Sequence, residues 1–153
     1  MGWYEDWQQM IRQVLFADEE LKELMLIPED KRDDALEFVD KYFIESPAPD
    51  EVMLKEDVRV LFYDEAGKET SHPFVTRKIF SIDVYVKKDK LYGGDEDDYM
   101  KRRDRLIFQR IRSLISKKRF KGYNFTCYDD YPLSCKVEGY ARYHGVFYYK
   151  KTY

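Results

Sequence analysis

The chain has 153 residues, of which 44% are hydrophobic, 17% aromatic and 37% charged, and its formal net charge is -3. This length is typical of one domain, and the composition excludes a disordered chain, because enough apolar material is present to form a core. No apolar run exceeds four residues, which excludes a membrane-spanning segment and a secretory signal. We therefore expect a soluble globular protein that stays in the compartment where it is made.

The small net charge conceals a strong division along the chain. Residues 1–100 carry 26 Asp and Glu against 13 Lys and Arg, whereas residues 101–153 carry 4 against 14. If this division survives folding, acidic and basic surfaces of different copies could attract each other, or the basic part could meet nucleic acid. The alternative is that both halves mix into one surface of balanced charge.

Hydrophobic periodicity predicts two helices in the first part of the chain. Apolar residues recur every three or four positions over residues 3–25, with polar positions, Lys22 among them, on the opposite side. Pro28 and the acidic residues after it favour a second helix, to about Ile44, which the proline-containing segment 46–49 should end.

From residue 52 the period changes to two, which predicts strands. We expect a hairpin of residues 58–63 and 74–87 around a turn at 64–68, then a helix over about 99–118. A second strand pair should follow, with residues 123–128, a turn at 129–132, and residues 136–153. The pattern leaves open whether His144 and Gly145 form a bulge or a tight turn.

This order predicts an α+β fold, an antiparallel β-sheet with helices packed on one face and preceded by N-terminal helices. Residues 1–153 should form one domain, with a helical part at 1–45 and the sheet and its packed helix at 52–153. The third helix should pack on the sheet face that bears Phe80, Ile82, Val84 and Val86, through Leu106, Ile107, Ile111 and Leu114.

The search for chemical motifs gives little support for catalysis. Asp83, Tyr85 and Lys87 share a strand face, and with Asp64 they faintly suggest a metal-dependent nuclease, although any wet strand face carries such residues. The acidic run 95–98 lacks the spacing of a calcium loop and fits a solvated helix start. No nucleophile elbow or phosphate-binding loop is present, so we expect a protein that is not an enzyme and uses no metal or cofactor.

The two cysteines, Cys127 and Cys135, are expected to be reduced and structural, because no secretory signal is present. Their spacing also permits a hairpin disulfide. Zinc is disfavoured, because His72 and His144 lie far from any paired cysteine spacing.

The last part of the chain is basic and rich in aromatic residues. Residues 120–153 contain eight tyrosines and three phenylalanines among lysines and Arg142, a composition that could stack on bases and neutralise phosphates. Tyrosine also suits half-buried strands and protein interfaces. We therefore favour a protein interface over nucleic acid.

The element order, together with the segments 80–86, 103–115 and 137–143, resembles the neck and tail-completion proteins of tailed bacteriophages, especially the tail terminators. The resemblance covers about residues 50–153, and the acidic helix at 28–45 departs from the simplest members. It implies a structural virion protein, made in the host cytoplasm, that forms a homo-oligomeric ring, commonly a hexamer in such proteins. Such a ring joins the connector to the tail tube, and DNA passes through it.

The charge division suits this role, because a ring subunit presents one surface to a different surface of its neighbour. The residues that we expect at subunit or partner contacts are Lys101, Arg102, Arg105, Arg112, Tyr140, Arg142 and Tyr148. The alternative is a nucleic-acid-binding accessory protein that uses the basic, aromatic C-terminal third.

Overall fold

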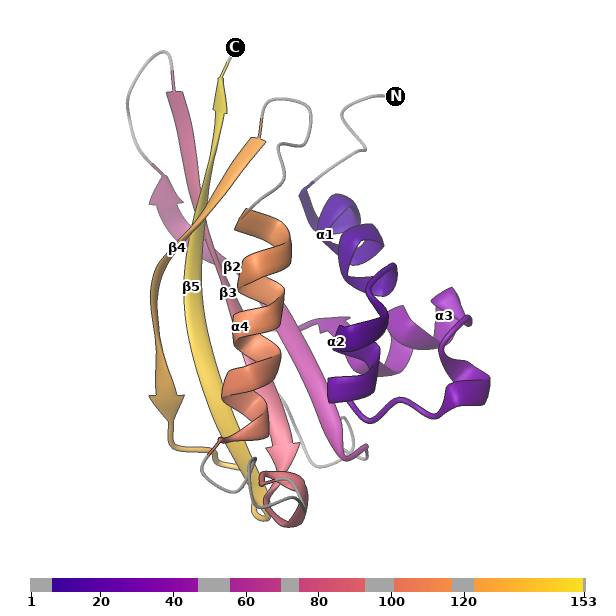
Figure 1. Cartoon of the computed structure of the whole chain (residues 1–153). Coiled ribbons are helices and arrows are strands. Elements are labelled where there is room, and N and C mark those ends of the chain that lie inside the picture. Colours follow the sequence, from indigo (N-terminus) through magenta and orange to yellow (C-terminus); the bar gives the residue numbers. More distant parts are fainter. Residues whose placement is uncertain (1–6, 47–55, 70–74, 93–100, 117–122, 153) are drawn as a thin grey trace.

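The computed structural model describes residues 7–46, 56–69, 75–92, 101–116 and 123–152, which form helices and one five-stranded sheet (Figure 1). The sheet order is β1-β2-β3-β5-β4, and the α+β class predicted from the sequence is confirmed. The elements are α1 (Trp7–Phe16), α2 (Glu19–Leu24), η2 (Glu29–Lys31), α3 (Ala35–Glu37), η3 (Phe38–Tyr42), β1 (Phe43–Glu45), β2 (Val58–Glu69), β3 (Val75–Lys87), η4 (Lys88–Lys90), α4 (Arg103–Ser116), β4 (Tyr123–Leu133) and β5 (Tyr140–Thr152).

The helical part is more broken than its periodicity predicts. The helix expected over residues 3–25 ends at Phe16, because Asp18 starts a new helix by accepting a hydrogen bond from the Leu21 amide at 2.9 Å. The break changes which side faces the core. Lys22, expected on the solvent side, is only 3% exposed and donates to the Arg32 carbonyl oxygen.

The helix expected over residues 28–44 is replaced by short turns of different kinds. A 3-10 turn is followed by the three-residue α3, whose N-cap Asp34 accepts from the Glu37 amide, and then by the π-helical turn η3. From Phe43 the chain runs as β1, which pairs in parallel with β2, whereas the other strand pairs of the described residues are antiparallel. Phe43 stacks on Phe62 of β2 with ring centroids 4.5 Å apart, and this burial favours strand over helix at its position.

Both turns predicted within the strand pairs are wrong. β2 continues through residues 64–68 to Glu69, and β4 continues through 129–132 to Leu133. In β4 the register shifts between Cys127 and Asp129, so Tyr128 lies in a β-bulge and is 75% exposed. His144 and Gly145 form neither a bulge nor a turn, because both lie in regular register with β3.

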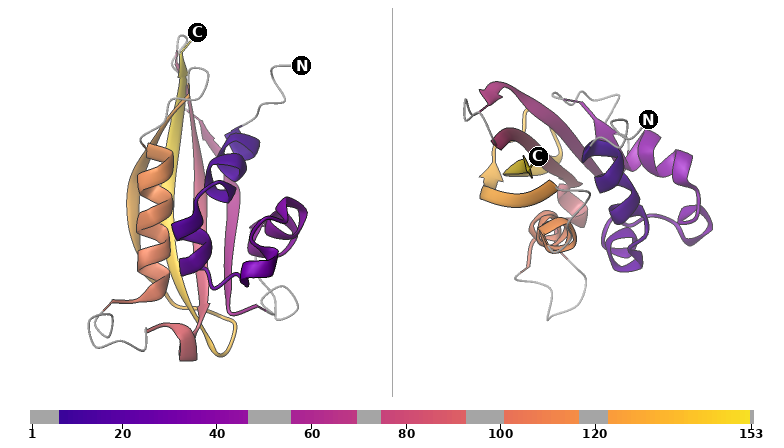
Figure 2. Two further views of the ribbon diagram at one scale, coloured as in Figure 1. Left: turned by 45° about the vertical axis from the view of Figure 1, so that its right-hand side comes forward. Right: turned by 90° about the horizontal axis from the view of Figure 1, so that it is seen from above.

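The helices lie along one face of the sheet, as the turned view in Figure 2 shows, and the core lies between that face and the helices. Val60, Ile82 and Phe147 come from the strands, and α4 contributes Ile107, Phe108, Ile111 and Ile115. The predicted packing face of α4 is therefore confirmed for Ile107 and Ile111. Leu114 is partly buried and also packs against this core, whereas Leu106 is partly buried at its margin, because the stripe of α4 turns toward Phe108 and Ile115.

Gly145 explains how α4 approaches the sheet so closely. A Cβ atom at this position would overlap the Phe108 ring, which occupies the space left by the missing side chain. Glycine in a strand interior often marks such a close approach. Within the described residues no helix is both long and apolar enough to cross a membrane.

Candidate functional site

Most of the basic residues predicted at an interface lie on α4 or in the two residues that precede it. Lys101 and Arg105 are exposed, and neither side chain has a hydrogen bond or salt bridge with another described residue. With Tyr92, Arg102, Leu106 and Gln109 they line a groove of about 440 Å³ near the first turn of the helix. We call this the first-turn groove. Its unpaired cations suit it to an anionic partner.

Arg102 has a different role, because it forms a salt bridge within the chain. Its Nε and Nη2 donate to the two carboxylate oxygens of Asp104 at 3.1 and 2.7 Å, and Asp104 is fully buried. The Asp104 carboxylate raises the pKa of Arg102. Such a bidentate pair stabilises the start of α4, since removing Arg102 would leave the buried carboxylate of Asp104 without its cation.

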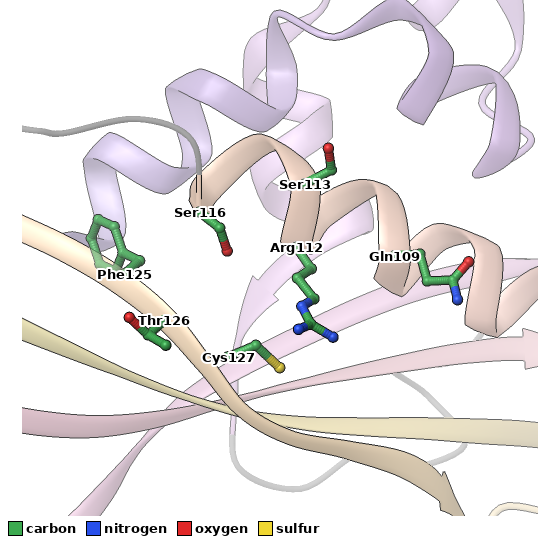
Figure 3. Close-up of a pocket in the computed structure, with 7 residues that line it drawn as sticks. All are labelled: Gln109, Arg112, Ser113, Ser116, Phe125, Thr126 and Cys127. Atoms are coloured by element: carbon green, nitrogen blue, oxygen red, sulfur yellow. The ribbon is translucent and has the colours of Figure 1, made fainter.

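A second groove lies between the later part of α4 and β4 (Figure 3). It encloses about 480 Å³, and Arg112 points from α4 toward Cys127 of β4. Arg112 pairs with Asp130 at 3.2 Å.

Cys127 is a free thiol, as is Cys135, and burial raises the pKa of Cys127 to about 11. The predicted free cysteines are thus seen, and Cys127 is poorly suited to act as a nucleophile near neutral pH.

The remaining predicted interface residues, Tyr140, Arg142 and Tyr148, come from β5 and not from α4. Tyr140 is buried and donates its hydroxyl to the Glu56 carbonyl oxygen at 2.9 Å. Arg142 and Tyr148 are partly buried. Arg142 is register partner to Tyr85 of β3, so it lies on the sheet face opposite the helices. The structure therefore divides the predicted residues between two surfaces.

Asp83 is the centre of a polar cluster on this second sheet face. Its carboxylate, 1% exposed, accepts from the Tyr63 hydroxyl at 3.1 Å and from Arg142 at 2.8 Å, and its other oxygen lies 2.5 Å from Nδ1 of His144. Burial and the Asp83 carboxylate raise the pKa of Tyr63 to about 12. Sequence reasoning missed His144 and Tyr63, because their proximity depends on the strand register.

This cluster does not have the open carboxylates of the nuclease hypothesis. All described partners of Asp83 are donors that occupy its oxygens, and Lys87 instead lies 3.9 Å from Asp57. The described residues contain no group of three His, Cys, Asp or Glu side chains placed to hold a metal ion. The arrangement is that of a buried, internally paired network.

The helical part is acidic, so its charge is opposite to that of α4 and the first-turn groove. Residues 7–46 contain eleven Asp and Glu against five Lys and Arg, while residues 101–116 contain six basic residues against one acidic residue. Part of this charge is paired within the chain, because Arg110 of α4 binds Asp18 at 2.7 Å and Glu20 at 3.1 Å. Within the described part, several exposed carboxylates have no hydrogen bond or salt bridge: Glu23, Glu29, Asp30, Asp33 and Asp40.

The fold and these surfaces define a class. It is an α+β protein with N-terminal helices before a mixed sheet, in which, among the described residues, the first-turn groove carries unpaired cations and the helical part carries unpaired carboxylates. The profile of the YomW family matches residues 18–149, and the chain therefore belongs to this family. The family is of the Bacillus phage SPBc2 type, which indicates a phage protein. No curated protein matches the chain.

Proposed function

We propose that this protein is a ring-forming structural subunit at the head–tail joint of a tailed phage, as a tail terminator, neck or tail-completion protein. It acts by binding copies of itself and the neighbouring connector and tail-tube proteins, without catalysis, and it resides in the virion. The phage family supports the setting. The observation that carries the proposal is that, within the described residues, unpaired carboxylates lie on the helical part and unpaired cations line the first-turn groove.

This separation is what a ring requires of one subunit. In a ring each copy contacts its neighbour through two different surfaces, so the contact repeats around the axis until it closes. Opposite charges on these surfaces increase the association rate and fix the register of the contact. The helical part and the first-turn groove are different surfaces of one chain, and among the described residues they carry opposite unpaired charge.

The nucleic-acid hypothesis has less support from the geometry. It depends on exposed aromatic rings, yet several rings of the C-terminal third are buried in the core: Phe125, Tyr143, Phe147 and Tyr149. Tyr128 and Tyr131 of β4 are the exposed large aromatic residues that the described part of this region presents. Two rings on an edge strand form a small platform for stacking.

The test is the mass of the purified chain by size exclusion with light scattering, from micromolar to millimolar concentration, combined with electron microscopy of the assembled fraction. We expect a closed oligomer with a central opening, and the chain should also be found in purified particles of a phage that encodes it. A monomer at every concentration, together with its absence from particles, would contradict the proposal. A gel shift with duplex DNA that weakens steeply with salt would favour the nucleic-acid alternative.

A further inference from the structure

The first-turn groove combines charge with apolar surface. Lys101 and Arg105 line it and have no hydrogen bond or salt bridge from their side chains to another described residue. Leu106 contributes an aliphatic side chain, and Tyr92, 47% exposed, contributes an aromatic ring. Interfaces typically place an apolar anchor at the centre and charges at the rim. The groove therefore fits a partner with an exposed apolar side chain between carboxylates.

The helical part of the same chain has this composition. Leu36 in α3 is 75% exposed, and it is the one large aliphatic side chain among the exposed large hydrophobic residues of the described part. Its neighbours in the chain include the unpaired carboxylates of Asp30 and Asp33. An exposed leucine alone is ordinary, but one that closely follows two exposed carboxylates in the chain matches the groove in both charge and polarity.

We propose that α3 of one copy docks into the first-turn groove of the next copy, with Leu36 against Tyr92 and Leu106, and Asp30 and Asp33 facing Lys101 and Arg105. This inference rests on the proposed ring and identifies its repeating contact. The partner is a second copy of this chain because the complementary surface belongs to this chain. Leu36 is too exposed to be occupied by the groove of its own molecule, and Figure 2 shows α1 and α2 lying between α3 and α4.

A cross-linking experiment tests this contact between copies. Two variants are made in a chain whose native cysteines are replaced by Cys127→Ser and Cys135→Ser. One variant carries Leu36→Cys, and the other carries Gln109→Cys at an exposed position of the groove. The two variants are mixed and treated with a short bismaleimide linker. A covalent dimer of the two different chains is expected. The matched control replaces Gln109→Cys with Lys136→Cys, an exposed position between β4 and β5, and should give little product.

Charge reversal tests the same contact by a second measurement. Lys101→Glu with Arg105→Glu should weaken self-association by roughly tenfold or more, since like charges then face each other. Asp30→Lys with Asp33→Lys should do the same. An equimolar mixture of the two variants should associate more strongly than either alone, because opposite charges again meet. Lys136→Glu, which reverses an exposed cation elsewhere, should leave association unchanged.

The outcomes separate this inference from the ring itself. If the wild type forms rings that neither charge reversal nor Leu36→Asp affects, and no specific cross-link appears, the docking of α3 is wrong while the ring stands. If the wild type never associates, the proposed function fails as well. If the groove variants lose only DNA binding and assemble normally, the groove serves nucleic acid and the inference is overturned. Circular dichroism confirms that each variant is folded.

Discussion

At the residue scale, the environment of Asp83 differs from the one that its sequence pattern predicts, because that environment depends on the strand register. In the sequence it is one polar residue on an alternating strand, and this pattern predicts solvent contact. In the structure it is buried, and Arg142 and His144 come to it from β5, about 60 positions away. The alternation predicted the correct face of the strand, but it could not show that donors from other strands would enclose the carboxylate.

We expect Asp83→Ala to destabilise the fold by about 3–5 kcal/mol, because Arg142 and His144 would lose their buried partner. Urea unfolding measures the change, and Glu138→Ala, an exposed acidic residue, is the control that should change little. A loss below about 1 kcal/mol for Asp83→Ala would show that the cluster contributes little to stability.

At the element scale, α4 connects the core to the proposed interface. Its inner stripe packs on the sheet, and its outer side carries the exposed cations. Helical periodicity predicted the helix and the sheet face that it covers, and it selected Ile107 and Ile111 correctly. It also placed Leu106 in the core, because the sequence does not show where Gly145 lets the Phe108 ring approach the sheet.

Ile111→Ala should cost about 2–5 kcal/mol of unfolding free energy, since Ile111 is fully buried and its truncation leaves a cavity. Leu106→Ala should cost about 1 kcal/mol or less, because Leu106 is only partly buried. Denaturant unfolding of both variants compares the two positions. Equal losses would mean that the packing stripe of α4 is misplaced.

The link between α2 and α4 gives a prediction for acid stability. The hydrogen bond from Arg110 holds the pKa of Asp18 below its ordinary value of 3.8. A lowered pKa in the folded state means that the stabilisation is complete above the unfolded pKa and is lost as the pH falls through the folded pKa. Asp18→Asn keeps a capping side chain, and so it isolates the charge.

The unfolding free energies of the wild type and Asp18→Asn should therefore differ by a constant amount above about pH 5, with the wild type more stable. The difference should shrink as the pH falls below about 4. Urea unfolding at a series of pH values checks this, and Arg110→Met should reduce the same pH dependence. A difference that grows at acid pH would have the wrong sign and would refute the pairing.

At the scale of the whole molecule, the charge division only partly survives folding. Arg110 and Arg102 are neutralised inside the chain by Asp18 and Asp104. What remains for partners is the unpaired charge of the first-turn groove and of the helical part. The sequence therefore indicated the sign of each surface, while the structure decided which charges are free to contact another molecule.

Because these remaining charges are exposed, self-association should weaken with added salt. The screening length falls from about 10 Å at 0.1 M salt to about 3 Å at 1 M, so attraction between exposed surfaces is largely lost. Light scattering at both salt concentrations measures the change in assembly. Association that strengthens with salt would indicate an apolar contact in place of the electrostatic one.

The sequence by itself determined the α+β class, the existence of α4, the sheet face that it covers and the opposite charges of the two parts of the chain. These features follow from periodicity and composition, which act over a few neighbouring residues. The tertiary structure decided that residues 43–45 form a strand, with Phe43 stacked on Phe62, and that Asp83 contacts His144. It also decided that β2 and β4 continue as strands where turns were expected. Each depends on a partner distant in the sequence, because pairing and burial override local turn and helix preferences.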